Sequence, residues 1–285
     1  MTTLKGLAYA KVNLALHVTG QRDDGHHLLD SLVVFATVAD RLTVTTANDL
    51  SLTVSGPFSA GVPRDDSNLV MRAARLLQRM RNVAQGAKIT LEKHLPNAAG
   101  IGGGSSDAAE TLRLLSTLWD VDPIPALAPE IVQLGADLPV CLAAPKSIRM
   151  TGIGEHIQQI GDLPDAAIVL VNPKVSVPTG AVFSNLVEKT NGPLEPIPEQ
   201  ADFDQFVDWL SRQRNDLARP AAKVAPDIDV AIAELQKHPN VALAGMSGSG
   251  ATCWALTRTM ADARHIARAI QVRHMDWWVA PAELT

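Results

Sequence analysis

The chain contains few aromatic residues and little cysteine. Of its 285 residues, 4% are Phe, Trp or Tyr, and two are cysteines. The core therefore has to be aliphatic, and any aromatic ring at a ligand site comes from a small set. Two cysteines exclude a disulfide framework and a cysteine-rich zinc site. Because Cys141 and Cys253 lie in apolar runs, we expect both to be buried thiols.

A basic excess and long apolar runs are also absent. The formal net charge is −5 at pH 7, which argues against a protein that coats nucleic acid. No window offers the roughly 18 uncharged apolar residues of a transmembrane helix. The first residues lack the apolar segment of a signal peptide. The sequence therefore predicts a soluble, cytoplasmic protein with neither a nucleic-acid nor a membrane partner.

The chain has enough apolar residues, 46%, to bury a sizeable core. Strand-like and helix-like spacings of these residues alternate, which predicts an α+β fold in two domains, 1–152 and 153–285. We expect strands at 7–19, 31–37, 41–46, 50–55, 87–91, 167–171, 241–244, 252–256 and 277–280. We expect helices at 68–80 (capped by Ser67), from about 105, and at 126–134, 179–187, 203–210, 227–236 and 261–272.

The strongest local signal is a glycine-serine loop before a helix. Four glycines occupy five positions between Gly100 and Gly104, and Ser105 and Ser106 follow. The spacing fits neither a P-loop, which needs a Lys here, nor the dinucleotide fingerprint, which needs glycine where Ser105 stands. Glycines let a backbone approach a ligand closely, and a helix start offers unpaired N–H groups to an anion. Phosphate binding is favoured over a flexible connector.

Three further segments carry chemistry but leave two interpretations each. The glycine loop 244–251 is either a hairpin turn or part of a shared anion site. Lys11 and Asn13 share one face of a strand, which is either exposed or a site face. Asp137 either caps a short turn or serves as a general base. The adjacent His26 and His27 point apart, which argues against a metal pair.

Taken together, these segments resemble the GHMP kinase superfamily, named for galactokinase, homoserine kinase, mevalonate kinase and phosphomevalonate kinase. The resemblance covers nearly the whole chain and includes both glycine loops. It is most specific in 10–14, 19–27, 134–140 and 176–179, which match the branch that acts on diphosphocytidyl methylerythritol. It implies an N-terminal domain like domain 2 of ribosomal protein S5 and a ferredoxin-like C-terminal domain.

The resemblance also implies an activity and its residues. ATP, with Mg²⁺, would phosphorylate the 2-hydroxyl of 4-diphosphocytidyl-2-C-methyl-D-erythritol in the non-mevalonate route to isoprenoids and terpenoids. Asp137 would be the base, and Lys11 would orient it. The residues implied to bind ATP are Pro96, Asn97, Ala98, Ala99, Gly100, Ile101, Gly102, Gly103, Gly104, Ser105 and Ser106, with Ser106 also a candidate Mg²⁺ ligand. Those implied to bind the cytidyl substrate are Asn13, His26, His27, Thr179 and Phe183.

Two positions depart from the family pattern. His26 stands where the family usually has a Tyr that would stack on cytosine, so we expect weaker stacking, with Phe183 as the opposite ring. The loop begins Asn97-Ala98-Ala99 where the family favours glycines, and Ala resists positive φ. Two other functions remain possible at this point: another superfamily kinase, such as homoserine or mevalonate kinase, and a nucleotide-binding module without catalysis.

Overall fold

The computed structural model describes residues 2–285, which cluster into two compact units. Unit 1 takes the chain up to Ala10 together with Ala39–Asn97 and Gly102–Ala144. Unit 2 takes Lys11–Val38, Ala98–Ile101 and Pro145–Thr285. The units interleave along the chain, and the domains expected at 1–152 and 153–285 stay a prediction.

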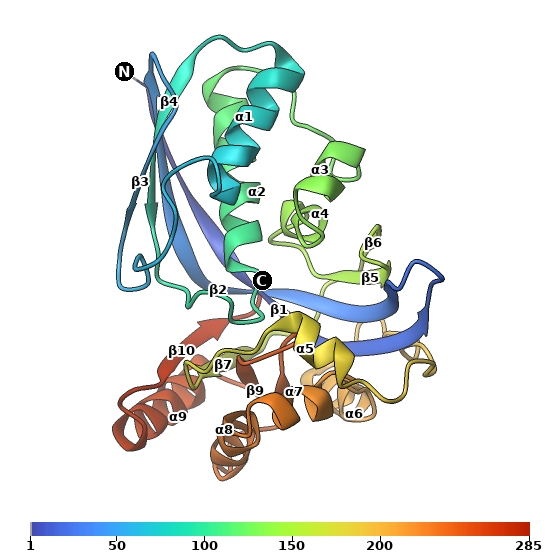
Figure 1. The fold of residues 1–285 in the computed structure, drawn as a ribbon. Helices are drawn as coiled ribbons and strands as arrows, with labels where there is room; N and C mark the ends of the chain where they lie inside the picture. Colours follow the sequence, from blue (N-terminus) through green and yellow to red (C-terminus); the bar gives the residue numbers. More distant parts are fainter. Residues whose placement is uncertain (1) are drawn as a thin grey trace. The chain divides into compact units, whose positions relative to one another are not determined.

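Unit 1 packs helices on one side of a sheet. Its strands are the first part of β1 (Thr3–Gln21), the last part of β2 (His27–Ala47), β3 (Ser51–Ser55) and β4 (Gly86–Glu92). β4 runs antiparallel to β2 and parallel to β3. Its helices are α1 (Leu69–Arg81), α2 (Gly103–Leu118), α3 (Pro129–Leu134) and α4 (Leu138–Leu142). Figure 1 shows α1 and α2 lying side by side against these strands.

The apolar periodicity of unit 1 explains its core. The buried face of α1 carries Ala73, Leu76 and Leu77, which join aliphatic residues of β4 and α2 in one cluster. The cap of α1 is Asn68, whose side chain accepts a hydrogen bond from the N–H of Val70. The prediction of Ser67 was wrong by one residue, because its hydroxyl instead donates to Asp65.

Unit 2 is built on an antiparallel sheet of order β10-β7-β9-β8. These strands are β7 (Ala167–Asn172), β8 (Leu243–Met246), β9 (Cys253–Thr257) and β10 (Trp278–Glu283). The helices α8 (Asp227–Gln236) and α9 (Met260–Arg273) pack on this sheet. The unit also holds β5 (Ile148–Gly152), β6 (His156–Gln159), α5 (Thr179–Ser184), α6 (Phe203–Ser211) and α7 (Ala218–Val224).

The mixed helix and strand content confirms the expected α+β class, with two differences in detail. The short elements β5, β6, α4 and α7 were not predicted. The two strands expected at 31–37 and 41–46 form one strand, β2, which continues through Asp40. An Asp usually ends a strand, but Asp40 is fully buried and its carboxylate is hydrogen-bonded. Both cysteines are buried, as expected.

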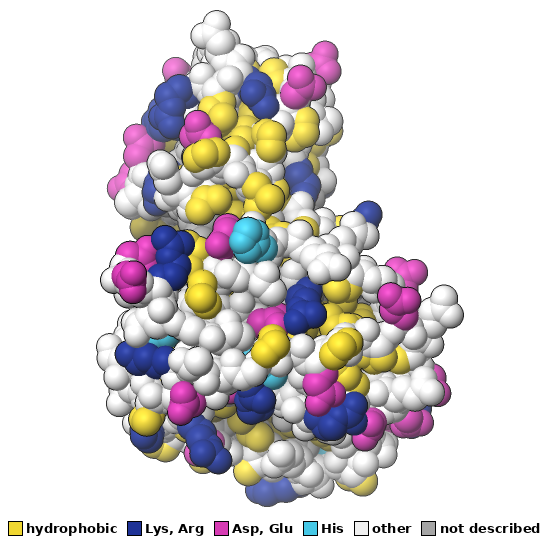
Figure 2. Space-filling view, turned by 90° about the vertical axis from the view of Figure 1, so that its right-hand side faces the viewer, with side chains coloured by type: hydrophobic (Ala, Val, Ile, Leu, Met, Phe, Trp, Pro, Cys, Tyr) yellow, Lys and Arg dark blue, Asp and Glu magenta, His cyan; other side chains and the backbone are white. Residues whose placement is uncertain are grey.

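The molecular surface carries charges of both signs. On the face drawn in Figure 2, acidic and basic side chains are interspersed among small apolar areas. Among the exposed large apolar side chains, Val187 lies after α5, whereas Val272 and Met275 lie at the end of α9 and just after it. Among residues 2–285, no helix has both the length and the apolar character needed to cross a membrane.

Candidate active site

The predicted phosphate loop lies between the end of β4 and the start of α2. Gly100 and Gly102 adopt left-handed backbone conformations, with φ of 73° and 64°. The first turn of α2 holds no acidic residue, and no side chain caps it. Its N–H groups and the positive end of the helix dipole therefore remain available to an anion.

The loop also contains one non-glycine residue with positive φ. Ala98 has φ of 50°, a conformation that costs an L-residue about 1–2 kcal/mol. The sequence analysis expected the alanines of this stretch to resist positive φ. The chain nevertheless makes the turn there, so the strain is carried by the folded loop.

The second glycine loop, 244–251, and the residue after it support the first loop inside unit 2. The hydroxyl of Ser247 donates to the carbonyl of Gly100 at 3.0 Å, and the N–H of Thr252 donates to the carbonyl of Ala99 at 3.2 Å. A Cβ at Gly100 would lie 2.6 Å from the carbonyl oxygen of Gly250, so only glycine fits. The second loop connects the antiparallel strands β8 and β9, so it is a hairpin turn that also braces the first loop.

Lys11 and Asn13 lie on a buried face of β1. They are 5% and 1% exposed, which overturns the alternative of an exposed sheet face. The backbone N–H of Lys11 donates to the carbonyl of Ile101, and that of Asn13 donates to Ser247 Oγ. The Asn13 side-chain amide donates to Ser31, while its Oδ1 is buried and makes no hydrogen bond. Asn13 thus offers an orphaned acceptor directly beside the glycine loops.

Asp137 stands at the N-cap position of α4 in unit 1. Its side chain makes no capping hydrogen bond, so capping does not explain its presence. The side chain is half-buried. Lys11 belongs to unit 2, so the pairing of Lys11 with Asp137 stays a prediction.

The residues predicted to bind a cytidyl group lie close together within unit 2. The rings of His27 and Phe183 stack with their centroids 4.7 Å apart. Burial, followed by the charges of Lys189 and His26, lowers the pKa of His27. His26 is largely exposed and lies 3.2 Å from Asp24. Of the two histidines, His27 is therefore the one that faces Phe183.

Thr179 was assigned to the same pocket. Its hydroxyl lies 2.9 Å from that of Ser249, in the second glycine loop. Both hydroxyls are solvent-exposed, so they remain open to a ligand. Thr179 begins α5, the helix that carries Phe183 one turn later.

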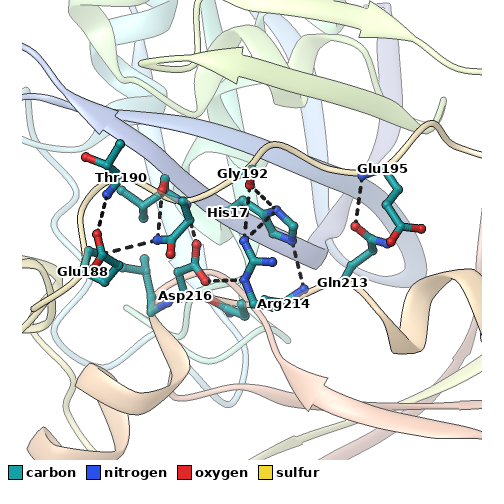
Figure 3. A network of polar contacts seen from close by, with 12 residues as sticks. His17, Glu188, Thr190, Gly192, Glu195, Gln213, Arg214 and Asp216 are labelled. Carbon is teal, nitrogen blue, oxygen red and sulfur yellow. Dashed lines mark hydrogen bonds and ion pairs between the residues drawn. The ribbon is translucent and has the colours of Figure 1, made fainter.

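A segment that we call the strap, residues 188–195, holds the end of β1 (Figure 3). His17 Nδ1 donates to the carbonyl of Gly192 at 2.9 Å, and the N–H of Asn191 donates to the carbonyl of Val18. From the other side, the N–H of Arg214 donates to His17 Nε2 at 3.0 Å. The strap therefore fixes the strand that leads into the His26–His27 hairpin. The sequence analysis assigned no helix or strand to this segment and did not identify this support.

A buried charged cluster in unit 1 was missed by the sequence analysis. Lys93 Nζ donates to carboxylate oxygens of both Asp40 and Asp107, and all three residues are at most 3% exposed. Burial, with a contribution from Asp40, raises the pKa of Asp107, and the opposing effect of Lys93 limits this rise. Burial lowers the pKa of Lys93, but the two carboxylates offset this and raise it overall. The available signal was Lys93, which lies three residues before Pro96, the first residue of the loop.

The residues near the loop offer few metal ligands. Among residues 2–285, no group of three or more His, Cys, Asp or Glu is placed to hold a metal ion. Ser106, the predicted ligand, is 3% exposed and its hydroxyl donates to Cys141 Sγ at 3.4 Å. This donor set fits a Mg²⁺ ion that arrives on nucleotide phosphates better than a resident ion.

Comparisons with known proteins agree with this geometry. Residues 68–145 match the family model "GHMP kinases N terminal domain", and residues 199–275 match "GHMP kinases C terminal". A 4-diphosphocytidyl-2-C-methyl-D-erythritol kinase of Cereibacter sphaeroides is 48% identical over 98% of this chain and 99% of its own. One of Dinoroseobacter shibae is 51% identical over 99% of this chain and 95% of its own.

Solved structures extend the comparison. A crystal structure of 4-(cytidine 5'-diphospho)-2C-methyl-D-erythritol kinase has a TM-score of 0.82 and 30% identity, with 99% of each chain covered. A mevalonate kinase of Methanococcus jannaschii has a TM-score of 0.68 at 11% identity, over 100% of this chain and 99% of its own, which shows a shared fold. The N-terminal family match contains the phosphate loop and Asp137, and the relatives match along almost the whole chain. The chain belongs to the GHMP kinase family.

Proposed function

We propose that this chain is an ATP-dependent kinase that phosphorylates the 2-hydroxyl of 4-diphosphocytidyl-2-C-methyl-D-erythritol, a step toward isoprenoid precursors. The observation that carries the kinase assignment is the braced glycine loop that ends at an uncapped, acid-free helix start. The substrate assignment is supported by the named relatives at 48% and 51% identity. It is also supported by the ring pair of His27 and Phe183.

The nucleotide is proposed to bind along residues 96–106. Phosphoryl transfer depends mainly on positioning and on neutralising charge. Backbone N–H groups of the loop and of the first turn of α2 can supply both, because they are fixed before the ligand arrives. Mg²⁺ is proposed to enter bound to ATP, where it neutralises phosphate charge. For Ser106 to bind this ion, its hydroxyl would have to leave Cys141.

The acceptor is proposed to bind beside β1. The orphaned Oδ1 of Asn13 can accept a hydrogen bond from a substrate hydroxyl. His26, His27, Thr179 and Phe183 are proposed to bind the cytidyl group. Asp137 is proposed to take the proton from the attacking 2-hydroxyl, and Lys11 to orient that carboxylate and offset the developing negative charge. Cytoplasmic localisation stays a prediction.

The experiment is ADP release by the purified protein with MgATP, with and without the diphosphocytidyl methylerythritol. We expect ADP release that depends on this acceptor, and a product phosphorylated on the 2-hydroxyl by ³¹P and ¹³C NMR. Homoserine and mevalonate are the competing acceptors. The Asp137→Asn protein, purified in parallel, controls for a contaminating kinase. Acceptor-independent ADP release, or faster turnover of homoserine or mevalonate, would refute the proposed substrate.

A further inference from the structure

Three buried charged side chains of unit 1 have no part in the proposed reaction. Asp40 on β2, Lys93 just after β4 and Asp107 on α2 are 0%, 3% and 2% exposed. Burying charges is costly, and apolar side chains of similar size often replace a buried ion pair without loss of stability. A need for stability alone is therefore a weak reason for this cluster.

The contacts of the cluster connect the two ends of the phosphate loop. Asp40 Oδ1 accepts hydrogen bonds from the backbone N–H groups of His94 and Leu95, where the chain enters the loop. Asp40 Oδ2 accepts a hydrogen bond from Lys93 Nζ. The same amine donates to Asp107 Oδ2 at 2.7 Å, where the chain leaves the loop. One ammonium group thus joins the entering and the leaving arm.

The start of α2 rests on this cluster. A Cβ at Gly103, the first residue of the helix, would lie 3.5 Å from Lys93 Nζ and 3.9 Å from Asp40 Oδ2. The N–H groups proposed to bind phosphate belong to this turn and to the loop before it. Their position relative to Leu95 therefore depends on the length of the Asp40–Lys93–Asp107 connection.

The cluster is also not optimised for stability. Asp107 Oδ1 is buried and makes no hydrogen bond, which is costly for a carboxylate. The helices α1 and α4, which pack on α2, bring no further charge to the cluster. The helix α4 carries no charged residue, and the arginines of α1 lie outside its buried face.

We propose that Lys93, through Asp40 and Asp107, is a positioning residue that fixes the separation of the two arms of the phosphate loop and so sets the affinity for ATP. This inference rests on the proposed nucleotide site but not on the identity of the acceptor. Nucleotide binding without an acceptor therefore tests it separately from the proposed substrate.

The decisive variant is Asp107→Ala, which cuts the connection to α2 and leaves Lys93 paired with Asp40. We measure the Kd of a non-hydrolysable ATP analogue with Mg²⁺ by calorimetry, and the melting temperature of the same samples. We expect the Kd to rise about tenfold or more, because the binding groups are misplaced. The melting temperature should fall less than the loss of a whole buried ion pair would cause, because Lys93 stays paired with Asp40. Asp107→Asn, which keeps an oxygen acceptor for Lys93, is expected to stay within about threefold of the original Kd.

Steady-state kinetics provide the second readout. For Asp107→Ala we expect the KM for ATP to rise with the Kd, while the KM for the acceptor changes by less than about threefold. Lys93→Arg, which keeps two donors, is expected to bind nucleotide better than Lys93→Met. Arg149→Met is the matched control, because it breaks an ion pair with Asp30, and both residues are distant from the phosphate loop in sequence.

Three outcomes overturn the proposal. One is an unchanged Kd in a folded Asp107→Ala protein. Another is a rise in Kd accompanied by a proportional rise in the acceptor KM and a proportional fall in kcat, which indicates a general structural defect. The third is an equal rise in Kd in Arg149→Met. If Asp107→Ala fails to fold, the comparison of Lys93→Arg with Lys93→Met decides, and equal nucleotide affinity in those two proteins refutes the positioning role.

Discussion

The two proposed ligand regions of this kinase differ in the groups that they offer to a ligand. The phosphate loop presents mostly backbone, and its shape is maintained by interactions behind it: the braces from Ser247 and Thr252 and the buried cluster around Lys93. The cytidyl region presents side chains, and its two stacked rings are partly open to solvent. A backbone site is sensitive to changes in the layer behind it, whereas a side-chain site is sensitive to changes in the residues that touch the ligand.

The largest expected effect is on kcat, and it distinguishes the proposed base from the two binding regions. Asp137→Asn keeps the size of the side chain but removes the proposed base. We expect kcat to fall by about 10²- to 10⁴-fold, the usual contribution of general base catalysis. Both KM values should stay within about threefold, because neither binding region is altered. Steady-state kinetics with each substrate varied provide the measurement, and near-normal turnover would remove Asp137 from the mechanism.

The next effect tests whether side chains carry cytidyl binding. Phe183→Ala removes the ring on which a base can stack, and stacking contributes about 1–3 kcal/mol per base. We expect the KM for the cytidyl substrate to rise about 10- to 100-fold, with the KM for ATP unchanged. Phe58→Ala offers a control on an aromatic residue that is assigned to no substrate.

Substitution of His26 tests further which side chains bind the cytidyl group. His26 was predicted to stack on cytosine, whereas in the structure His27 occupies the face of Phe183. A base cannot fit between rings whose centroids are 4.7 Å apart, so it has to displace His27 or stack elsewhere. His26→Ala should raise the cytidyl KM less than Phe183→Ala does, and more than it raises the KM for ATP. Equal rises in the two KM values would count against placing His26 in the pocket.

A smaller effect tests the strain in the backbone site. Ala98→Gly relieves a left-handed alanine, so we expect the free energy of unfolding to rise by about 1 kcal/mol. The nucleotide Kd should stay within about twofold, because no side-chain contact is lost. Urea denaturation measures the first quantity and calorimetry the second. Ala99→Gly, where φ is not positive, should destabilise the protein instead.

The smallest effect concerns the electrostatics of the ring pair. Burial lowers the pKa of His27 first, and the Lys189 charge lowers it further. Lys189→Ala should therefore raise the pKa of His27 toward 6.5 without reaching it, as measured by NMR titration of the imidazole C–H signals. Lys223→Ala removes another exposed lysine of unit 2 and should leave this pKa unchanged. A His27 pKa that does not respond to Lys189→Ala would contradict the proposed electrostatic interaction.

The sign of the accompanying pH dependence follows from the same shift. Because the folded pKa of His27 lies below the unfolded value, the unfolded chain binds a proton first as the pH falls. The contribution of His27 to stability is therefore present above about pH 6.5 and is lost as the pH falls below that value toward the folded pKa. Lys189→Ala should narrow the pH range between the unfolded and the folded pKa of His27, over which this stability is lost.

Local patterns in the sequence predicted much of the fold and the phosphate loop. Glycine spacing and helix periodicity are properties of neighbouring residues, so the loop and α2 could be located without a structure. The Lys93 cluster could not be located, because Asp40 lies 53 positions before Lys93 and only the pairing of β2 with β4 brings them together. Asp40 even misled the strand assignment, since an isolated Asp usually indicates a turn.

Among the site residues, too, local patterns predicted some features, whereas others depend on residues that are distant in sequence. Lys11 and Asn13 were recognised from one strand. Their contacts come from distant residues: Asn13 is hydrogen-bonded to Ser31 and Ser247, and the backbone N–H of Lys11 donates to Ile101. The strap has no local pattern that predicts a helix or strand, and the sequence analysis assigned it no function. Its function as a fixed support depends on His17 and Arg214, whose hydrogen bonds no local pattern encodes.

The interleaving of the two units has a consequence for how this protein can be divided. The chain passes from one unit to the other after Ala10, Val38, Asn97, Ile101 and Ala144. No single cut therefore releases either unit as one continuous polypeptide. A fragment that ends at residue 144 would carry β1 and β2 in full, and the part of β2 that pairs with β5 would lack its partner. Engineering by domain exchange or by split reporters would therefore need to keep β1 and β2 with both halves of the molecule.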